Sequence, residues 1–207
     1  MNQQSFEQIV GALAAKTPTP GGGAAAAMAG TMGAALFLMV VRFSRGKKAN
    51  VDREGDLARA EAALDGHVKR LLPMAERDCR SFDLVSAAYS MPKDNDGQKT
   101  LREKAIQEAM VGAMVVPEET LCMVRDVFAA MQPVSACIGK AIVSDLASGA
   151  ALLLAAAEGA FLNVRINANF LTNRELADRT LDRATTVMQE VRRQQQTIAV
   201  SVDKMLA

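Results

Sequence analysis

One uncharged stretch, residues 21–41, constrains the fold of this chain more than any other segment. It follows the sequence PTPGGG at residues 18–23 and ends shortly before GKK at residues 46–48. The prolines hold the backbone before the helix in an extended conformation. The glycines Gly21, Gly22 and Gly23 allow a sharp turn in which the backbone amides stay uncovered. The run of Ala, Met and Leu that follows favours a helix. We therefore predict an apolar helix with a bare, electropositive N-terminus that attracts anions.

Three interpretations of this stretch compete. A membrane span is long enough at about 20 residues, but alanine and glycine do little to drive insertion. A phosphate-binding P-loop is rejected, because the GxxxxGK[ST] spacing is missing and no strand precedes the glycines. We favour a buried core helix, in which Ala26, Gly30 and Ala34, spaced by four, let a second helix approach closely. A ligand site at the glycine turn is compatible with it.

Composition excludes several function classes. The net charge of +1 predicts no general attraction to nucleic acid or acidic membrane, and only 4% aromatic residues make base-stacking platforms unfavourable. Three widely spaced cysteines and the single His67 provide too few ligands for a zinc or iron–sulfur site. The N-terminus, from Met1 and Asn2 onward, lacks the basic start and apolar run of a signal peptide. We expect a reduced, cytoplasmic protein.

Hydrophobic periodicity indicates helices throughout and no alternating strand. We expect helices over residues 5–15, 21–43, 52–89, from about 98 to 131, 138–171 and 174–207, with a polar loop at 44–51. Pro73 should bend or break the third of these, and Pro117 should interrupt the fourth. The fold class is all-α, a single domain over residues 1–207 forming an elongated bundle. The apolar helices are longer than a monomeric bundle easily covers, which predicts a helix-mediated homodimer.

A carboxylate occupies an apolar position in one heptad pattern. The members of this seam are spaced alternately four and three: Leu64, Val68, Leu71, Ala75, Asp78, Phe82, Val85 and Tyr89. Because a buried unpaired carboxylate is costly, Asp78 needs either a partner or a chemical task. Both possibilities, an arginine salt bridge or water at the kink and a functional role, stay open.

A second polar stripe crosses the apolar stretch at residues 138–171. Asp145, Asn163 and Asn167 fall on one helical face among small residues. In a continuous helix Asp145 and Asn163 are about 27 Å apart, from the rise of about 1.5 Å per residue. Either the helix breaks near Gly159, or a pocket draws on two subunits, or one of these residues is structural. The asparagines are one turn apart and can act together or simply bond neighbouring helices.

The residues supply acids, amides and lysines rather than a nucleophile. There is no GxSxG motif and no sign of a cysteine–histidine pair. Such a set suits proton transfer on a substrate that is already electrophilic. A buried carboxylate, Asp78 or Asp145, can have a raised pKa and act as acid or base.

The motifs together resemble the cyclodeaminase/cyclohydrolase family, which includes the C-terminal domain of formiminotransferase-cyclodeaminase and free-standing methenyl-tetrahydrofolate cyclohydrolases. The resemblance covers nearly the whole chain. It rests on PTPGGG and GKK, on DCRSF at 78–82 with AYSMPK at 88–93, on Arg102 with AIQEA at 105–109 and VP at 116–117, on AIVSD at 141–145 and on LNVRIN at 162–167. Two positions depart from the family pattern. Ile138-Gly139 stands where Gly-Asn is common, and Ala49-Asn50 follows GKK where an aromatic residue is usual.

The resemblance implies an all-α, dimeric enzyme that acts on one-carbon folates with no metal and no cofactor beyond the tetrahydrofolate substrate. It implies Asp145 or Asp78 as the base or acid, and Lys48 as a positive charge beside the pocket. The amides of Gly21, Gly22 and Gly23 would bind a carbonyl or carboxylate. Asn163 and Asn167 would bind polar ring edges, and Lys47, Lys93 or Arg102 the glutamate tail.

Within this resemblance we favour hydrolysis of methenyl-tetrahydrofolate to formyl-tetrahydrofolate, because the chain carries no formiminotransferase domain to deliver a formimino group. The alternative is a cyclodeaminase that closes the formimino compound and releases ammonia. From a different class, the alternative is a non-catalytic folate-binding or scaffold dimer. A related one-carbon pterin stays open as the substrate.

Overall fold

The computed structural model describes residues 3–207, so the expectation for the N-terminal start, insofar as it rests on Met1 and Asn2, lies outside the described residues. Over the described range the chain is helical and contains no strand, which confirms the all-α prediction. The α-helices are α1 Phe6–Ala14, α2 Gly22–Ser44, α3 Glu54–Leu71, α4 Met74–Tyr89, α5 Asp96–Met131, α6 Val143–Asn169 and α7 Arg174–Leu206. Short 3₁₀ helices η1 Lys48–Arg53, η2 Gln132–Cys137 and η3 Lys140–Ile142 connect them.

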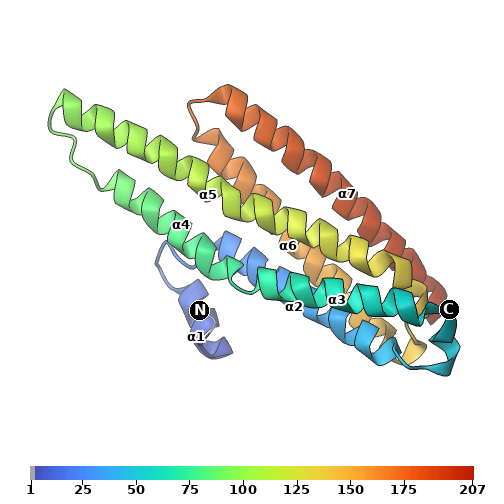
Figure 1. The fold of residues 1–207 in the computed structure, drawn as a ribbon. Coiled ribbons are helices and arrows are strands. Elements are labelled where there is room, and N and C mark those ends of the chain that lie inside the picture. Colours follow the sequence, from blue (N-terminus) through green and yellow to red (C-terminus); the bar gives the residue numbers. More distant parts are fainter. Residues whose placement is uncertain (1–2) are drawn as a thin grey trace.

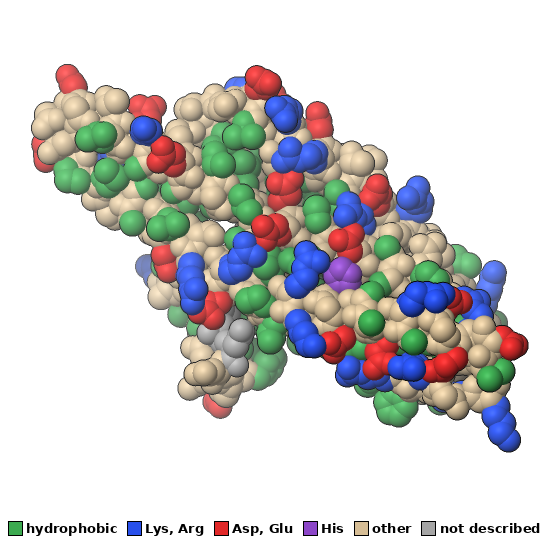
Figure 2. All heavy atoms as spheres, viewed as in Figure 1, with side chains coloured by type: hydrophobic (Ala, Val, Ile, Leu, Met, Phe, Trp, Pro, Cys, Tyr) green, Lys and Arg blue, Asp and Glu red, His purple; other side chains and the backbone are tan. Residues whose placement is uncertain are grey.

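The helices form an elongated bundle, in which α2 and α6 pack together and lie behind α3, α4 and α5 in the view of Figure 1. The helices α3 and α4 follow one another along one side, and α5 and α7 complete the bundle. The helix α1 stands away from the others, and Phe6 on it is 75% exposed. Figure 2 shows acidic and basic side chains interspersed over the face formed by α3, α5 and α7, so this face has no single-sign field.

The contact between α2 and α6 is made by small residues on antiparallel helices. A Cβ on Gly33 would lie 2.8 Å from the carbonyl oxygen of Gly149, and a Cβ on Gly149 would lie 2.8 Å from the ring of Phe37. Further along, a Cβ on Gly159 would lie 3.0 Å from that of Ala26. The two backbones therefore lie close together, which confirms the prediction of a core helix approached by a second helix.

The prolines act differently from one another. Pro73 separates α3 from α4, as the 52–89 pattern predicted. The predicted interruption at Pro117 is wrong, because α5 continues through it as one helix of 36 residues. The carbonyl that Pro117 deprives of a helical donor is that of Ala113, and it accepts a hydrogen bond from Asn167 on α6 instead.

The helix α6 is also unbroken, from Val143 through Gly159 to Asn169. The possibility of a break near Gly159 is thereby excluded, and Asp145 and Asn163 lie far apart on one helix. By length and composition alone, two segments are apolar enough to cross a membrane, Gly22–Ser44 and Lys140–Asn169. In this fold they pack against each other, and both contribute residues to the main hydrophobic cluster.

Candidate functional site

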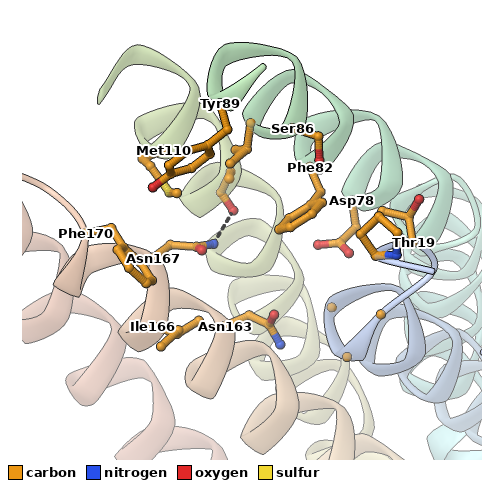
Figure 3. A pocket seen from close by; sticks show the side chains of 16 residues that line it. Thr19, Asp78, Phe82, Ser86, Tyr89, Met110, Asn163, Ile166, Asn167 and Phe170 are labelled. Atoms are coloured by element: carbon orange, nitrogen blue, oxygen red, sulfur yellow. Dashed lines mark hydrogen bonds between the residues drawn. The ribbon is translucent and has the colours of Figure 1, made fainter. Parts of the chain in front are cut away.

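A cavity of about 560 Å³ opens at the end of the bundle where α2 begins. The turn at residues 18–23 closes one side of it, α4 and α6 face each other across it, and α5 forms its back (Figure 3). Apolar side chains provide most of the lining, and a few polar groups converge within it, as is typical of small-molecule sites.

The Asp78 carboxylate lies against the start of α2. The N-cap of that helix is Gly21, which has no side chain to accept from the first turn. The N–H of Ala24 donates instead to the Asp78 carboxylate. A Cβ on Gly23 would overlap that carboxylate, so only glycine admits Asp78 so close to the helix. The N–H groups of Gly22 and Gly23 belong to the first turn and have no partner within the helix, which leaves them for solvent or a ligand.

Burial raises the pKa of the Asp78 carboxyl above its ordinary value. The hydrogen bond from Ala24 favours the ionised form, but it is weaker than the desolvation. The sequence left open that an arginine pairs with Asp78. Among the described residues, no arginine forms a salt bridge with Asp78. The result is a carboxyl group that lies in a cavity and has a pKa above that of an ordinary aspartic acid, which makes it a candidate for acid or base chemistry.

Two asparagines from α6 face Asp78 across the cavity (Figure 3). Asn163 donates through Nδ2 to the carbonyl of Gly159 at 2.8 Å, and a Cβ on Gly22 would lie 3.5 Å from that nitrogen. Asn167 donates through Nδ2 to the carbonyl of Ala113 at 2.9 Å. The predicted cluster of Gly21, Gly22, Gly23, Asp78, Asn163 and Asn167 is thus assembled in one cavity.

Aromatic side chains form the remaining walls. Phe82 lies between Asp78 and the outer end of the cavity, where Tyr89 and Phe170 line it (Figure 3). Arg102 donates to the carbonyl of Tyr89 at 3.0 Å, and its guanidinium lies 5.5 Å from the centre of the Tyr89 ring. Flat apolar walls around a few polar groups suit a planar heterocycle.

Five predicted residues do not line this cavity, and one of them is Arg102, which bonds to the carbonyl of Tyr89 at its outer end. Lys47 and Lys48 follow the C-terminal end of α2, about 33 Å from Gly22 by the helical rise. Asp145 is in the first turn of α6, at the same far end. Lys93 is exposed in the loop between α4 and α5. Within one chain the structure does not bring Asp145, Lys47 or Lys48 to Asp78, and their roles remain predictions.

The two departures from the family pattern meet at that far end. The Nδ2 of the buried Asn50 donates to the carbonyl of Ser44 at 2.8 Å and to that of Cys137 at 3.0 Å. A Cβ on Gly139 would lie 4.0 Å from Nζ of Lys47. Each departing pair thus lies beside a neighbour of the other, and neither pair lines the cavity of the same chain.

Sequence reasoning missed most of the cavity walls, although a signal for them was present. The C-terminal half of the heptad seam, Asp78, Phe82, Val85 and Tyr89, lines the cavity, and Val85 also belongs to a buried cluster with residues of α5. Ile166 and Phe170 continue the stripe of Asn163 and Asn167 on α6. A heptad seam that contains an acidic residue therefore also indicates a helix that lines a pocket. In the described part of the chain, no group of three or more His, Cys, Asp and Glu side chains is placed to hold a metal ion.

Comparison with known proteins agrees with this architecture. The solved structure of formiminotetrahydrofolate cyclodeaminase from Thermotoga maritima superimposes with a TM-score of 0.87 over 99% of this chain and 98% of that one, at 24% identity, and thus shares its fold. Methenyltetrahydrofolate cyclohydrolase from Methylorubrum extorquens is 38% identical over 180 residues, which cover 86% of each chain. Formimidoyltransferase-cyclodeaminase from Rattus norvegicus is 27% identical over 190 residues, which are 92% of this chain and 35% of the rat protein.

These features define a helical protein of the cyclodeaminase/cyclohydrolase class. The family model described as formiminotransferase-cyclodeaminase matches residues 5–186. The chain belongs to this family, and the resemblance drawn from its motifs is confirmed.

The raised pKa of Asp78 predicts that the stability of the fold depends on pH. Because the folded-state pKa exceeds that of the unfolded chain, ionisation destabilises the fold as the pH rises through this interval. Asp78→Asn cannot ionise, and its amide oxygen can still accept from Ala24. We expect chemical denaturation to show the variant at least as stable as wild type at neutral pH, with its advantage shrinking in acid. A variant that is clearly less stable at neutral pH would show that Asp78 is a structural anchor.

Proposed function

We propose that this protein is a methenyl-tetrahydrofolate cyclohydrolase with Asp78 as its acid/base group. The observation that carries the proposal is the Asp78 carboxyl, which burial and the glycine turn hold in a cavity opposite two amides. The identity of 38% to a cyclohydrolase, over 86% of both chains, supports it as well. A cyclodeaminase activity remains the second candidate. It is supported by relatives such as the rat protein, although the match covers only 35% of the length of that protein.

The reaction begins with water addition to the bridging carbon, an amidinium-like electrophile. The Asp78 carboxylate accepts one proton from water as the oxygen bonds to this carbon, and a tetrahedral carbinolamine forms. The protonated Asp78 then gives that proton to the departing ring nitrogen, while the carbon–nitrogen bond breaks and the hydroxyl becomes the formyl carbonyl. The hydroxyl proton passes to solvent, so one water is consumed and one proton is released.

The surrounding groups orient the substrate in this proposal. The amides of Gly22 and Gly23 bind a carbonyl or carboxylate oxygen at the positive end of α2. Asn163 and Asn167 bind the polar edge of the pterin ring, and the ring lies between the aromatic walls. Lys93 and Arg102, which follow Tyr89 in the sequence, bind the glutamate tail in this proposal. No metal and no cofactor beyond the folate substrate takes part in this scheme.

Asp78→Asn tests the assignment directly. Loss of methenyl-tetrahydrofolate absorbance, corrected for spontaneous hydrolysis, should slow by about 10²–10⁴-fold in kcat, the usual value of a positioned acid/base group. Asp83→Asn is the matched control, because Asp83 is exposed on the same helix and does not line the cavity. Equal activity of Asp78→Asn and wild type would refute the assignment. A wild type that is inactive here but releases ammonia from formimino-tetrahydrofolate would favour the cyclodeaminase.

We also propose that the protein is a homodimer formed through the shared outer face of α2 and α6. Met32 and Phe43 on α2 are 47% and 58% exposed, and Leu162 and Ile166 on α6 are 56% and 51% exposed. Large apolar side chains on two adjacent helices suit a contact between copies. This face borders the cavity, since Ile166 also lines it.

A two-fold axis across the middle of this face would bring opposite ends of two copies together. The end that carries Lys47, Lys48 and Asp145 would then lie beside the glycine turn of the partner. In this arrangement Asp145 and the lysines complete the partner's cavity, which is the two-subunit site that the sequence allowed. We expect a cytoplasmic location too, since the three cysteines form no disulfide among the described residues.

Mixed dimers distinguish a two-subunit site from a site in one chain. If Asp78→Asn and Asp145→Asn are each inactive alone, co-refolded mixtures should recover about a quarter of wild-type activity, because half of the dimers are mixed and each has one intact site. Recovery of no activity would place both residues in the same site of one chain. Full activity of Asp145→Asn by itself would show that Asp145 is not needed.

A further inference from the structure

The proline within α5 removes one hydrogen-bond donor at the back of the cavity. Pro117 has no N–H, so the carbonyl of Ala113, four residues earlier, has no partner within the helix. The proline ring also pushes that carbonyl away from the helix axis. Ala113 is buried and lines the cavity. An unpaired buried carbonyl is costly, so it needs a donor from another element.

Asn167 on α6 supplies that donor. Its Nδ2 lies 2.9 Å from the carbonyl oxygen of Ala113, the contact drawn as a dashed line in Figure 3. A carbonyl oxygen only accepts, so the amino side of the amide must face it. This fixes the orientation of the side chain and leaves Oδ1 as its free acceptor. Among the described residues no donor bonds to that oxygen.

Asn163 is oriented in the same way, one turn earlier on α6. Its Nδ2 donates to the carbonyl of Gly159, which again can only accept. Both asparagines therefore use an amino hydrogen on the backbone and keep a carbonyl oxygen unpaired. Both line the cavity on the face opposite Asp78.

We propose that Pro117 is a positioning residue. Because Pro117 gives the Ala113 carbonyl no donor, this carbonyl accepts from Asn167 and holds its side chain in place. Asn167 and Asn163 then present two acceptor oxygens to the ligand. These oxygens select a ring edge with neighbouring N–H donors. If the proposed function is correct, this edge is the amino and ring N–H edge of the pterin. A ring with acceptors at those positions is rejected, because acceptor would face acceptor.

The test is a double-mutant cycle of Pro117→Ala and Asn167→Ala, read by KM for methenyl-tetrahydrofolate and by thermal unfolding. Pro117→Ala restores a helical N–H to Ala113 and releases Asn167, so KM should rise about two- to tenfold, as for one lost hydrogen bond. Asn167→Ala should raise KM at least as much. In the double variant Pro117→Ala should raise KM no further, because the residue that it positions is gone.

Thermal unfolding gives a readout that does not depend on turnover. Pro117→Ala should raise Tm, since proline is unfavourable within a helix. In the Asn167→Ala background this gain should be larger by about 2–4 °C, because the new N–H then pairs a carbonyl that has no other donor. Gly112→Ala is the matched control on α5: its Cβ meets nothing within 4 Å and it gives Ala113 no donor. It should raise Tm without changing KM.

Additive effects on both KM and Tm would overturn the proposal, as would an unchanged KM in Pro117→Ala. If wild type hydrolyses no methenyl-tetrahydrofolate, the proposed function fails, but the Tm cycle still decides the link between the residues. Coupling in Tm then supports the positioning role of Pro117, and its absence overturns it.

Discussion

The close antiparallel contact of α2 with α6 determines how the glycine turn and the asparagines of the site lie relative to each other. At Gly33 and Gly149 the two helices approach so closely that neither position has room for a Cβ. This contact fixes the register between the helices and brings Gly22, at the start of α2, beside Asn163 near the end of α6. The cavity lies where the two helices reach α4 and the glycine turn. A side chain at Gly33 or Gly149 would therefore move the two sides of the cavity relative to each other.

Much of the fold follows from local rules in the sequence. The apolar run after PTPGGG predicted a core helix, and spacing-four small residues predicted its close neighbour, as found. Pro73 ended a helix as expected, whereas Pro117 did not. The difference depends on a partner that is 50 residues away in sequence, because Asn167 replaces the missing donor at Ala113. No local rule contains that information.

The site was predictable in part for the same reason. Asp78 stood out because a carboxylate in an apolar seam is costly, and Asn163 and Asn167 because they interrupt an apolar helix. Their convergence with the glycine turn needs the tertiary fold, and so does the distance that separates them from Asp145. The seam that suggested helix packing lines the cavity, since periodicity shows which side chains share a face but not what that face contacts.

The site combines one group that moves a proton with others that position the ligand. Desolvation raises the pKa of Asp78 although the helix start and the Ala24 N–H favour its ionised form. The asparagines bond to backbone carbonyls, which leaves acceptors facing the cavity. The departures from the family pattern at the far end, around Asn50 and Gly139, lie outside the cavity lining of the same chain.

The dependence of kcat/KM on pH tests the central claim most directly, once the spontaneous hydrolysis of methenyl-tetrahydrofolate is subtracted at each pH. If Asp78 is the base, activity falls in acid as one proton binds, with a midpoint above the ordinary pKa of 3.8 for an aspartic acid. Asp78→Asn should lose this limb together with its activity. A wild-type profile that stays flat through that range, or an unchanged acid limb in Asp78→Asn, would contradict the account.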